Sequence, residues 1–205
     1  MNILEQIEQK GKSGLATVIM FAKESAFDPL RAGTLQDLAD HGVSSVKDVS
    51  VGKLFVFEGL SQEQAVSLEK NLLVEETHQI GAVDGLPAHL KKGDYVFAVS
   101  FLPGVTNPEV ESLKYAAGHL KITLEKVLIA KVFVFHGSVS EKDRALIASV
   151  LMNKTVEYEL VQLPETLALG ASKEMKVENV KLTTGLAQIS ADRSLFLSLE
   201  EMKAI

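Results

Sequence analysis

The chain has 205 residues, a formal net charge of −6 and 46% hydrophobic residues, which is the composition of an ordinary globular protein. No apolar run approaches the roughly 20 residues that are needed to cross a bilayer. The net negative charge argues against nucleic-acid binding, which requires a clustered basic face. Cysteine is absent, which excludes disulfides, thiolate nucleophiles and cysteine-bound metals.

The first elements predicted are a short helix over residues 2–10 and a strand over 15–22. Acidic character at the N-terminus, where a signal peptide would carry positive charge, leads us to expect a cytoplasmic protein. Asp28 is suited to capping a helix that has Pro29 in its first turn and is ended by Gly42. The apolar face of this helix is expected to consist of Leu30, Leu35, Leu38 and Ala39.

A strand over 51–58 follows, and its apolar core does not alternate with polar residues, which predicts that both of its faces are covered. Ser61 and Gln64 have the spacing of a capping box at the start of a second helix. That helix is expected to bury Ala65, Leu68, Leu72 and Leu73. A weaker strand over 77–83 and a connection over 81–93, rich in glycine and basic residues, complete the first half.

The second half repeats this order, with strands over 95–102, 125–136 and 155–163 and helices that start at Asn107-Pro108 and at Ser140. After Pro164 the periodicity weakens, and residues 164–190 are predicted to be an extended connector. Residues 199–205 begin a helix that the chain does not finish. Because a helix needs several turns to be stable, we expect the chain to end inside a longer protein.

The two halves are similar in sequence as well as in order. Lys53–Gly59 returns as Lys131–Gly137, an offset of 131 − 53 = 78 that holds without a gap as far as Thr77 and Thr155. Such self-similarity indicates two copies of one small α/β unit. A unit of about 80 residues is marginally stable alone, so we expect each copy to cover the apolar face of the other.

Short motifs in both halves resemble the small S subunit (PurS) of formylglycinamidine ribonucleotide (FGAM) synthase, covering roughly residues 15–163. The matching residues are Asp28-Pro29, His41-Gly42, Val46, Val49, Val51-Gly52-Lys53 and, in the second half, 102–108 (Leu-Pro-Gly-Val-Thr-Asn-Pro). The tail over 195–205 is similar to the segment that leads into the synthetase part of that enzyme. The glycine that often follows Asp-Pro is replaced by Leu30 and Glu109, and Gly52 corresponds to Ala130.

The resemblance implies an α+β fold of two PurS-like β-α-β-α-β units, relatives of ferredoxin-like domains, that pair as a pseudo-dimer with helices packed on a joined antiparallel sheet. The expected units are residues 1–83 and 84–163, followed by a connector toward a synthetase over 164–205. The chain could also form a homo-oligomer, because the sequence leaves open whether the copies pair within one chain or swap between chains.

The resemblance also implies a role in purine biosynthesis. In that family the module is a non-catalytic scaffold that bridges the glutaminase and the ATP-dependent synthetase for ammonia transfer. The parent would be a ligase that uses ATP, magnesium and glutamine, with none of them bound by this region. The alternative is a ligand-sensing pair of ferredoxin-like regulatory domains with a polar cleft between the copies.

No catalytic, cofactor-binding or metal-binding residue is predicted. Residues 11–14 (Gly-Lys-Ser-Gly) lack the upstream glycine and strand of a phosphate loop, and no serine lies in a Gly-x-Ser-x-Gly elbow. None of the histidines, which are His41, His78, His89, His119 and His136, has metal-ligand spacing, and we expect His41 and His119 at helix ends.

Three further expectations concern charged and aromatic side chains. Lys53 and Lys131 are placed at equivalent strand starts, where solvation and protection of a strand edge are favoured over contact with a partner. The acidic residues Glu63, Glu69, Glu75 and Glu76 are expected on solvated helix faces. Core positions rather than stacking on bases are expected for Phe55, Phe57, Phe133 and Phe135.

Overall fold

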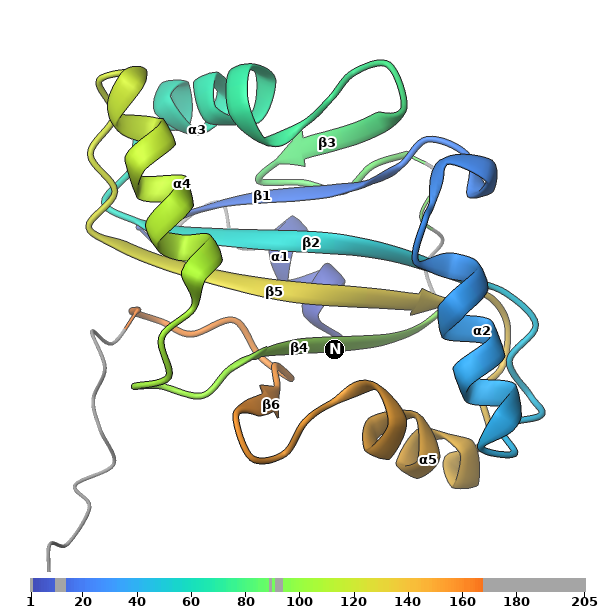
Figure 1. Cartoon of the computed structure of the whole chain (residues 1–205). Coiled ribbons are helices and arrows are strands. Elements are labelled where there is room, and N and C mark those ends of the chain that lie inside the picture. The colour runs from blue at the N-terminus through green and yellow to red at the C-terminus, as the bar shows by residue number, and fades with distance from the viewer. Residues whose placement is uncertain (1, 10–13, 89, 91–93, 168–205) are drawn as a thin grey trace, which may run out of the picture. The chain divides into compact units, whose positions relative to one another are not determined.

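The computed structural model describes residues 2–9, 14–88, 90 and 94–167 (Figure 1). These residues belong to one compact unit, Met1–Ala171. The predictions made for residues 11–13, for the connector beyond 167 and for the helix over 199–205 fall outside the described residues. His89 does so too.

The protein is α+β, with one six-stranded antiparallel sheet in the order β3-β1-β2-β5-β4-β6. Its strands are β1 (Leu15–Ala22), β2 (Val49–Glu58), β3 (Gln79–Val83), β4 (Tyr95–Phe101), β5 (Lys126–Phe135) and β6 (Glu157–Glu159). Its helices are α1 (Ile3–Gln9), α2 (Arg31–Asp40), α3 (Gln62–Leu68), α4 (Pro108–His119) and α5 (Glu141–Leu151), and a single π turn, Glu69–Leu73, continues α3.

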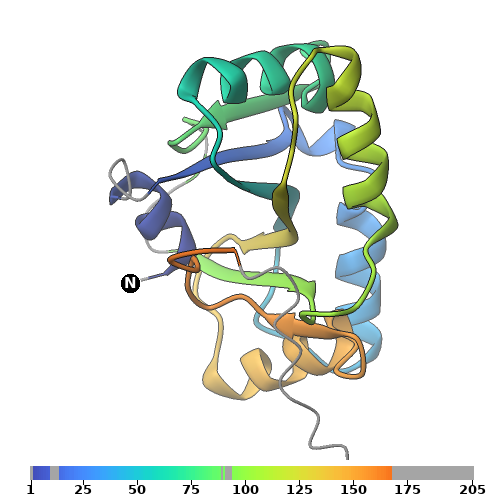
Figure 2. The same ribbon diagram turned by 90° about the vertical axis from the view of Figure 1, so that its left-hand side faces the viewer.

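Both faces of the two central strands are covered, as the lack of alternation predicts. Leu54 and Val56 pack in one cluster with residues of α1, whereas Phe55 and Phe57 pack in another with residues of α3 and α4. Figure 2 shows α1 on one side of the sheet and α2 and α4 on the other. The four phenylalanines expected in the core are all buried.

The helices on the larger face form two groups. Leu113 and Ala117 of α4 share a cluster with Ala65 and Leu68 of α3, and a separate cluster joins α2 to α5. In Figure 1 these groups lie at opposite ends of the sheet.

Side-chain caps begin the helices as the sequence indicates. Ser61 and Gln64 form the reciprocal capping box, and Asn107 and Ser140 each accept a hydrogen bond from a backbone N–H in the first turn. Helix α2 differs, because it begins at Arg31 and Pro29 lies in the preceding turn.

Asp28 nevertheless performs the capping role expected of it. Its Oδ1 accepts hydrogen bonds from the backbone N–H groups of Leu30 and Arg31, both at 3.1 Å. Its Oδ2 accepts a third from the N–H of Val51 at 2.9 Å. One carboxylate therefore satisfies donors at the start of α2 and also ties that helix to β2.

Several sequence predictions about exposure and boundaries are wrong. Leu30 is 51% exposed and Ala39 is also exposed, because the core of α2 is made by Thr34 and Leu38. Leu72 is 36% exposed, because the π turn rotates it away from the face that Ala65 and Leu68 bury. The connection between the halves begins at Asp84, since β3 continues through Gly81 to Val83.

The placement of Lys53 and Lys131 is also wrong. Each lies near the middle of a ten-residue strand, and the two residues are register partners across the β2–β5 ladder. Because β2 and β5 are the innermost strands, protection of a strand edge cannot be the role of these lysines. Lys53 forms an ion pair with Glu109.

Gly52 is required by close packing against β1. A Cβ atom added there would lie 2.3 Å from the carbonyl oxygen of Met20 and 2.5 Å from the ring of Phe21. The corresponding pair in the second half is Ser100 opposite Ala130, where a Cβ atom is present on both strands. The sheet is therefore packed more closely at this position in the first half.

Candidate functional site

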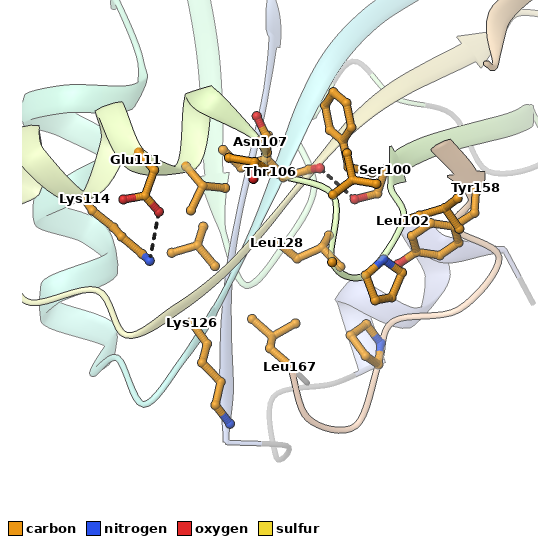
Figure 3. Close-up of a pocket in the computed structure, with 18 of the residues that line it drawn as sticks. Ser100, Leu102, Thr106, Asn107, Glu111, Lys114, Lys126, Leu128, Tyr158 and Leu167 are labelled. Atoms are coloured by element: carbon orange, nitrogen blue, oxygen red, sulfur yellow. Dashed lines mark hydrogen bonds and ion pairs between the residues drawn. The ribbon is translucent and has the colours of Figure 1, made fainter. Parts of the chain in front are cut away.

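A hollow with a volume of about 460 Å³ lies in the second half of the sequence (Figure 3). Its walls come from the loop 102–107, the first turns of α4, the start of β5 and the segment 164–167. With Pro108, this loop makes up the Leu-Pro-Gly-Val-Thr-Asn-Pro motif, the second-half part of the family resemblance. Much of the lining is apolar, with Leu102, Val105, Val110, Val127, Leu128 and Leu167.

The loop is held in place by local hydrogen bonds. The N–H of Val105 donates to the carbonyl of Leu102 at 3.0 Å, and Gly104 between them has φ 90°, a left-handed conformation that favours glycine. The N–H of Leu102 donates to the carbonyl of Val156 at 2.9 Å, and Asn107 Oδ1 caps α4. The rim of the hollow is therefore built from ordered backbone.

Several polar residues also line the hollow, and two pairs of them, Ser100 with Tyr158 and Lys114 with Glu111, lie at its two ends. Ser100 is buried, and its hydroxyl donates to the carbonyl oxygen of Ile129 at 2.9 Å. Burial raises the pKa of the neighbouring Tyr158, and a hydrogen bond with Ser100 partly opposes this rise. At the other end Lys114 pairs with Glu111 at 3.3 Å. These groups can orient a small polar end of a bound molecule, but they form no nucleophile–base pair.

Glu58 fixes the wall that closes the hollow after β6. The ammonium of Lys126 lies 2.7 Å from Glu58 Oε1, and the backbone N–H of Leu167 donates to Oε2 at 2.6 Å. The hydrogen bond from Lys126 and then that from Leu167 hold the pKa of Glu58 below its usual value. The end of β2 is thereby connected to residues more than a hundred positions later.

A second group of functional side chains lies at the opposite end of the central ladder. His136 Nε2 is 2.8 Å from Ser50 Oγ, and His136 Nδ1 is 2.8 Å from Asp94 Oδ2. The other carboxylate oxygen of Asp94 accepts the N–H of Gly137 at 3.3 Å. The three side chains form a continuous Ser–His–Asp hydrogen-bond chain.

The sequence does not predict this hydrogen-bond network, because Ser50 lies on a strand and not in a Gly-x-Ser-x-Gly turn. The three residues are 44 and 42 positions apart and share no motif. The internal repeat nevertheless offered a signal for the proximity of Ser50 and His136. A ladder centred on Lys53 and Lys131 places the start of β2 beside the end of β5.

The other described histidines have ordinary surroundings. His41 Nδ1 lies 2.7 Å from the carbonyl oxygen of Asp37, which confirms its position at a helix end. His119, at the end of α4, packs edge-on against Tyr115. Within residues 2–9, 14–88, 90 and 94–167, no three His, Asp or Glu side chains are grouped to hold a metal ion.

No model of a known protein family matches the chain, and no curated protein matches it in sequence. Among the helices that the structure describes, none combines the length and apolar character needed to span a membrane.

Proposed function

We propose that the chain is a tandem PurS-like region of an FGAM synthase, a non-catalytic scaffold that bridges the glutaminase and the ATP-dependent synthetase. The observation that carries the proposal is the pairing of Lys53 with Lys131 at the centre of the β2–β5 ladder. Two residues that are equivalent in the repeat face each other, as expected where a pseudo-twofold axis relates two paired units.

The other strand pairs support the same relation. Phe21 lies opposite Gly52 in the first half, and Ser100 lies opposite Ala130 in the second. The strand order is β3-β1-β2 followed by its mirror image, β5-β4-β6, so that each half contributes three adjacent strands. This arrangement fits two β-α-β-α-β units that form one joined sheet as a pseudo-dimer.

In this proposal the region positions its partners rather than performing chemistry. The parent ligase would use ATP, magnesium and glutamine elsewhere, and ammonia would pass between the glutaminase and the synthetase while protected from solvent. The loop 102–107 is the first surface to test as a contact. It carries the family motif, and it borders an apolar hollow of the kind that receives anchor side chains.

Calorimetric titration of the full chain with the matching glutaminase and the remaining synthetase tests the bridging role. We expect binding to at least one partner, and we expect Val105→Asp to weaken it about tenfold or more, because a charge would enter the apolar hollow. Ala26→Asp, at the equivalent exposed position of the first half, is the matched control. The bridging role is wrong if neither partner binds with or without nucleotide.

The ligand-sensing alternative predicts a cleft between the two copies. The 460 Å³ hollow is lined only by residues between Ser100 and Leu167, whereas a hollow of about 540 Å³ is lined by Asn2 and Ile3 together with residues between 94 and 161. A thermal-shift screen with amino acids and nucleotides separates the two functions. A sensor should gain stability with one ligand class, whereas a scaffold should show no response.

A further inference from the structure

We propose that Ser50, His136 and Asp94 form a nucleophilic serine site that accepts the acyl group of small activated carboxylic esters. The scaffold role makes no use of these residues, and they lie at the opposite end of the central ladder from the 460 Å³ hollow. Ser50 Oγ is the nucleophile, His136 Nε2 is the general base, and Asp94 is a positioning residue.

The hydrogen-bonding capacity of each group determines which atom donates and which accepts in the Ser50–His136–Asp94 network. An ionised carboxylate only accepts hydrogen bonds, so Nδ1 of His136 must carry the proton that is donated to Asp94. In neutral imidazole the other nitrogen is then an acceptor, and the hydroxyl of Ser50 donates to Nε2. This is the polarity that removes a proton from a serine when its oxygen attacks.

Burial is graded in the way that such a site requires. The side chain of Asp94 is 11% exposed and that of His136 is 30% exposed, while Ser50 is partly exposed. The N–H of Gly137 locks the carboxylate of Asp94, and the N–H of His136 is held by the carbonyl of Asp48 at 3.1 Å. A hollow of about 540 Å³ borders this network at its Asp94 end, where Asp94 and Gly137 line it, and Ser50 lies two strands away on β2.

The fold itself does not require the hydrogen-bond network of Ser50, His136 and Asp94. At the equivalent positions, at the other end of the ladder, lie Leu128, Glu58 and Leu15. There Leu15 faces Glu58, whose carboxylate pairs with Lys126 instead. The same strands therefore pair in the same register without a serine or a histidine, so the network is a specific addition to one end.

The acyl transfer balances without any further reactant. Ser50 Oγ forms a bond to the ester carbonyl carbon as its proton moves to His136 Nε2, and Asp94 stabilises the imidazolium. The carbon–oxygen bond to the leaving group then breaks, and His136 returns the proton to the departing oxygen. Water assisted by His136 later attacks the acyl-serine, which releases the acid and restores the hydroxyl.

The test is acylation of the full chain with p-nitrophenyl acetate, with the modified residues identified by mass spectrometry of a proteolytic digest. We expect Ser50 to be acetylated faster than the other serines, at a rate that rises with pH, because a general base acts in its deprotonated form. The charged groups facing His136 are Asp94 and Asp48, and Asp48 is partly neutralised by Arg31.

His136→Asn should lower the rate of Ser50 labelling about 100-fold, the typical contribution of a general base, and Ser50→Ala should abolish the labelled peptide. Asp94→Asn should lower the rate and change its pH profile, which a merely structural residue would not do. Ser149→Ala, which changes an exposed serine of α5 outside the hydrogen-bond network and the hollow, is the control and should leave labelling unchanged.

The proposal is overturned if Ser50 labels no faster than Ser149 in the same digest, or if His136→Asn leaves the rate unchanged. The pH profile of the native chain gives an independent measurement that does not depend on the folding of any variant. A rate at Ser50 that is the same at pH 5 and at pH 8 would also overturn it, because a general base acts only in its deprotonated form.

Discussion

The two halves of the sheet share their strand pairing but differ at one corner. In the first half, Arg31 at the start of α2 forms an ion pair of 2.6 Å with Asp48, just before β2. The equivalent positions of the second half hold Val110 and Lys126, and both residues line the 460 Å³ hollow. The Arg31–Asp48 ion pair thus has no counterpart between the equivalent residues of the second half, where Lys126 pairs with Glu58 instead.

This difference separates what the fold needs from what is free to change. Central strand register and helix caps recur in both halves because unpaired backbone groups and exposed apolar faces are costly. Corner residues at the strand ends carry no such constraint. We therefore expect variants of the closely packed strand positions and of the helix caps to have larger effects on stability than variants of exposed charged residues.

The largest expected effect compares Gly52 with Ala130. Gly52→Ala should destabilise the chain by about 3 kcal/mol, because the new Cβ would meet the backbone of Met20 and the ring of Phe21. Ala130→Gly should cost only about 1 kcal/mol, mainly through backbone entropy. Urea unfolding followed by circular dichroism measures both, and equal losses would show that the halves are packed alike here.

The next comparison concerns the two helix caps. Asp28→Ala should cost about 2 kcal/mol, because two N–H groups of α2 and the N–H of Val51 lose their acceptor. Asn107→Ala should cost about 1 kcal/mol, since Asn107 accepts a single hydrogen bond, from Glu109. The same urea titrations apply, and a larger loss at Asn107 would contradict the double role of Asp28.

Acidification should weaken the corner of the first half. Burial alone would raise the pKa of Asp48, but hydrogen bonds from Arg31 and Val49 outweigh it and hold the pKa below the ordinary value of 3.8. The unfolded chain therefore takes up this proton first, so the contribution is present above about pH 5 and is lost as the pH falls through the lowered pKa.

Because Asp48 is well exposed, this contribution should be less than about 1 kcal/mol. It is measured as the difference in urea midpoint between the native chain and Asp48→Asn, which should shrink from pH 6 to pH 3. A constant difference over that range would mean that the charge of Asp48 does not stabilise the fold.

The smallest effect is expected at the central lysines. Lys131→Glu should stabilise the chain by about 0.5 kcal/mol by placing opposite charges across the ladder. Lys53→Glu should not give this gain, because it would also set two carboxylates, its own and that of Glu109, beside each other. Thermal unfolding of the two variants measures this difference. High salt should reduce both changes in stability, because both are electrostatic.

Much of this fold could be predicted from local sequence signals. Strand β1 lies where predicted, and Ser61, Asn107 and Ser140 cap as expected because a cap depends only on neighbouring residues. The exposure of Leu30 could not be predicted in the same way. It depends on how α2 rests on the sheet, which the helical period alone does not set.

The candidate sites were harder to predict, because each is assembled by long-range pairing. Ser50, His136 and Asp94 come from three strand ends and become neighbours only through the β2–β5 and β4–β5 registers. The 460 Å³ hollow depends on Glu58 holding the backbone of Leu167, a contact with no local signal. The loop 102–107 could be recognised from its sequence motif, whereas the other residues that line the hollow could not be predicted.

In the pseudo-dimer proposed above, the facing pair Lys53 and Lys131 has a consequence for gene fusion. In a dimer of identical chains, a residue on the symmetry axis always meets its own duplicate, so any substitution there changes both sides at once. One continuous chain removes that restriction: Lys53 has an acidic neighbour, Glu109, whereas the position equivalent to Glu109 near Lys131 is Leu30. Joining two copies therefore lets each side of the axis evolve separately, which identical subunits can never do.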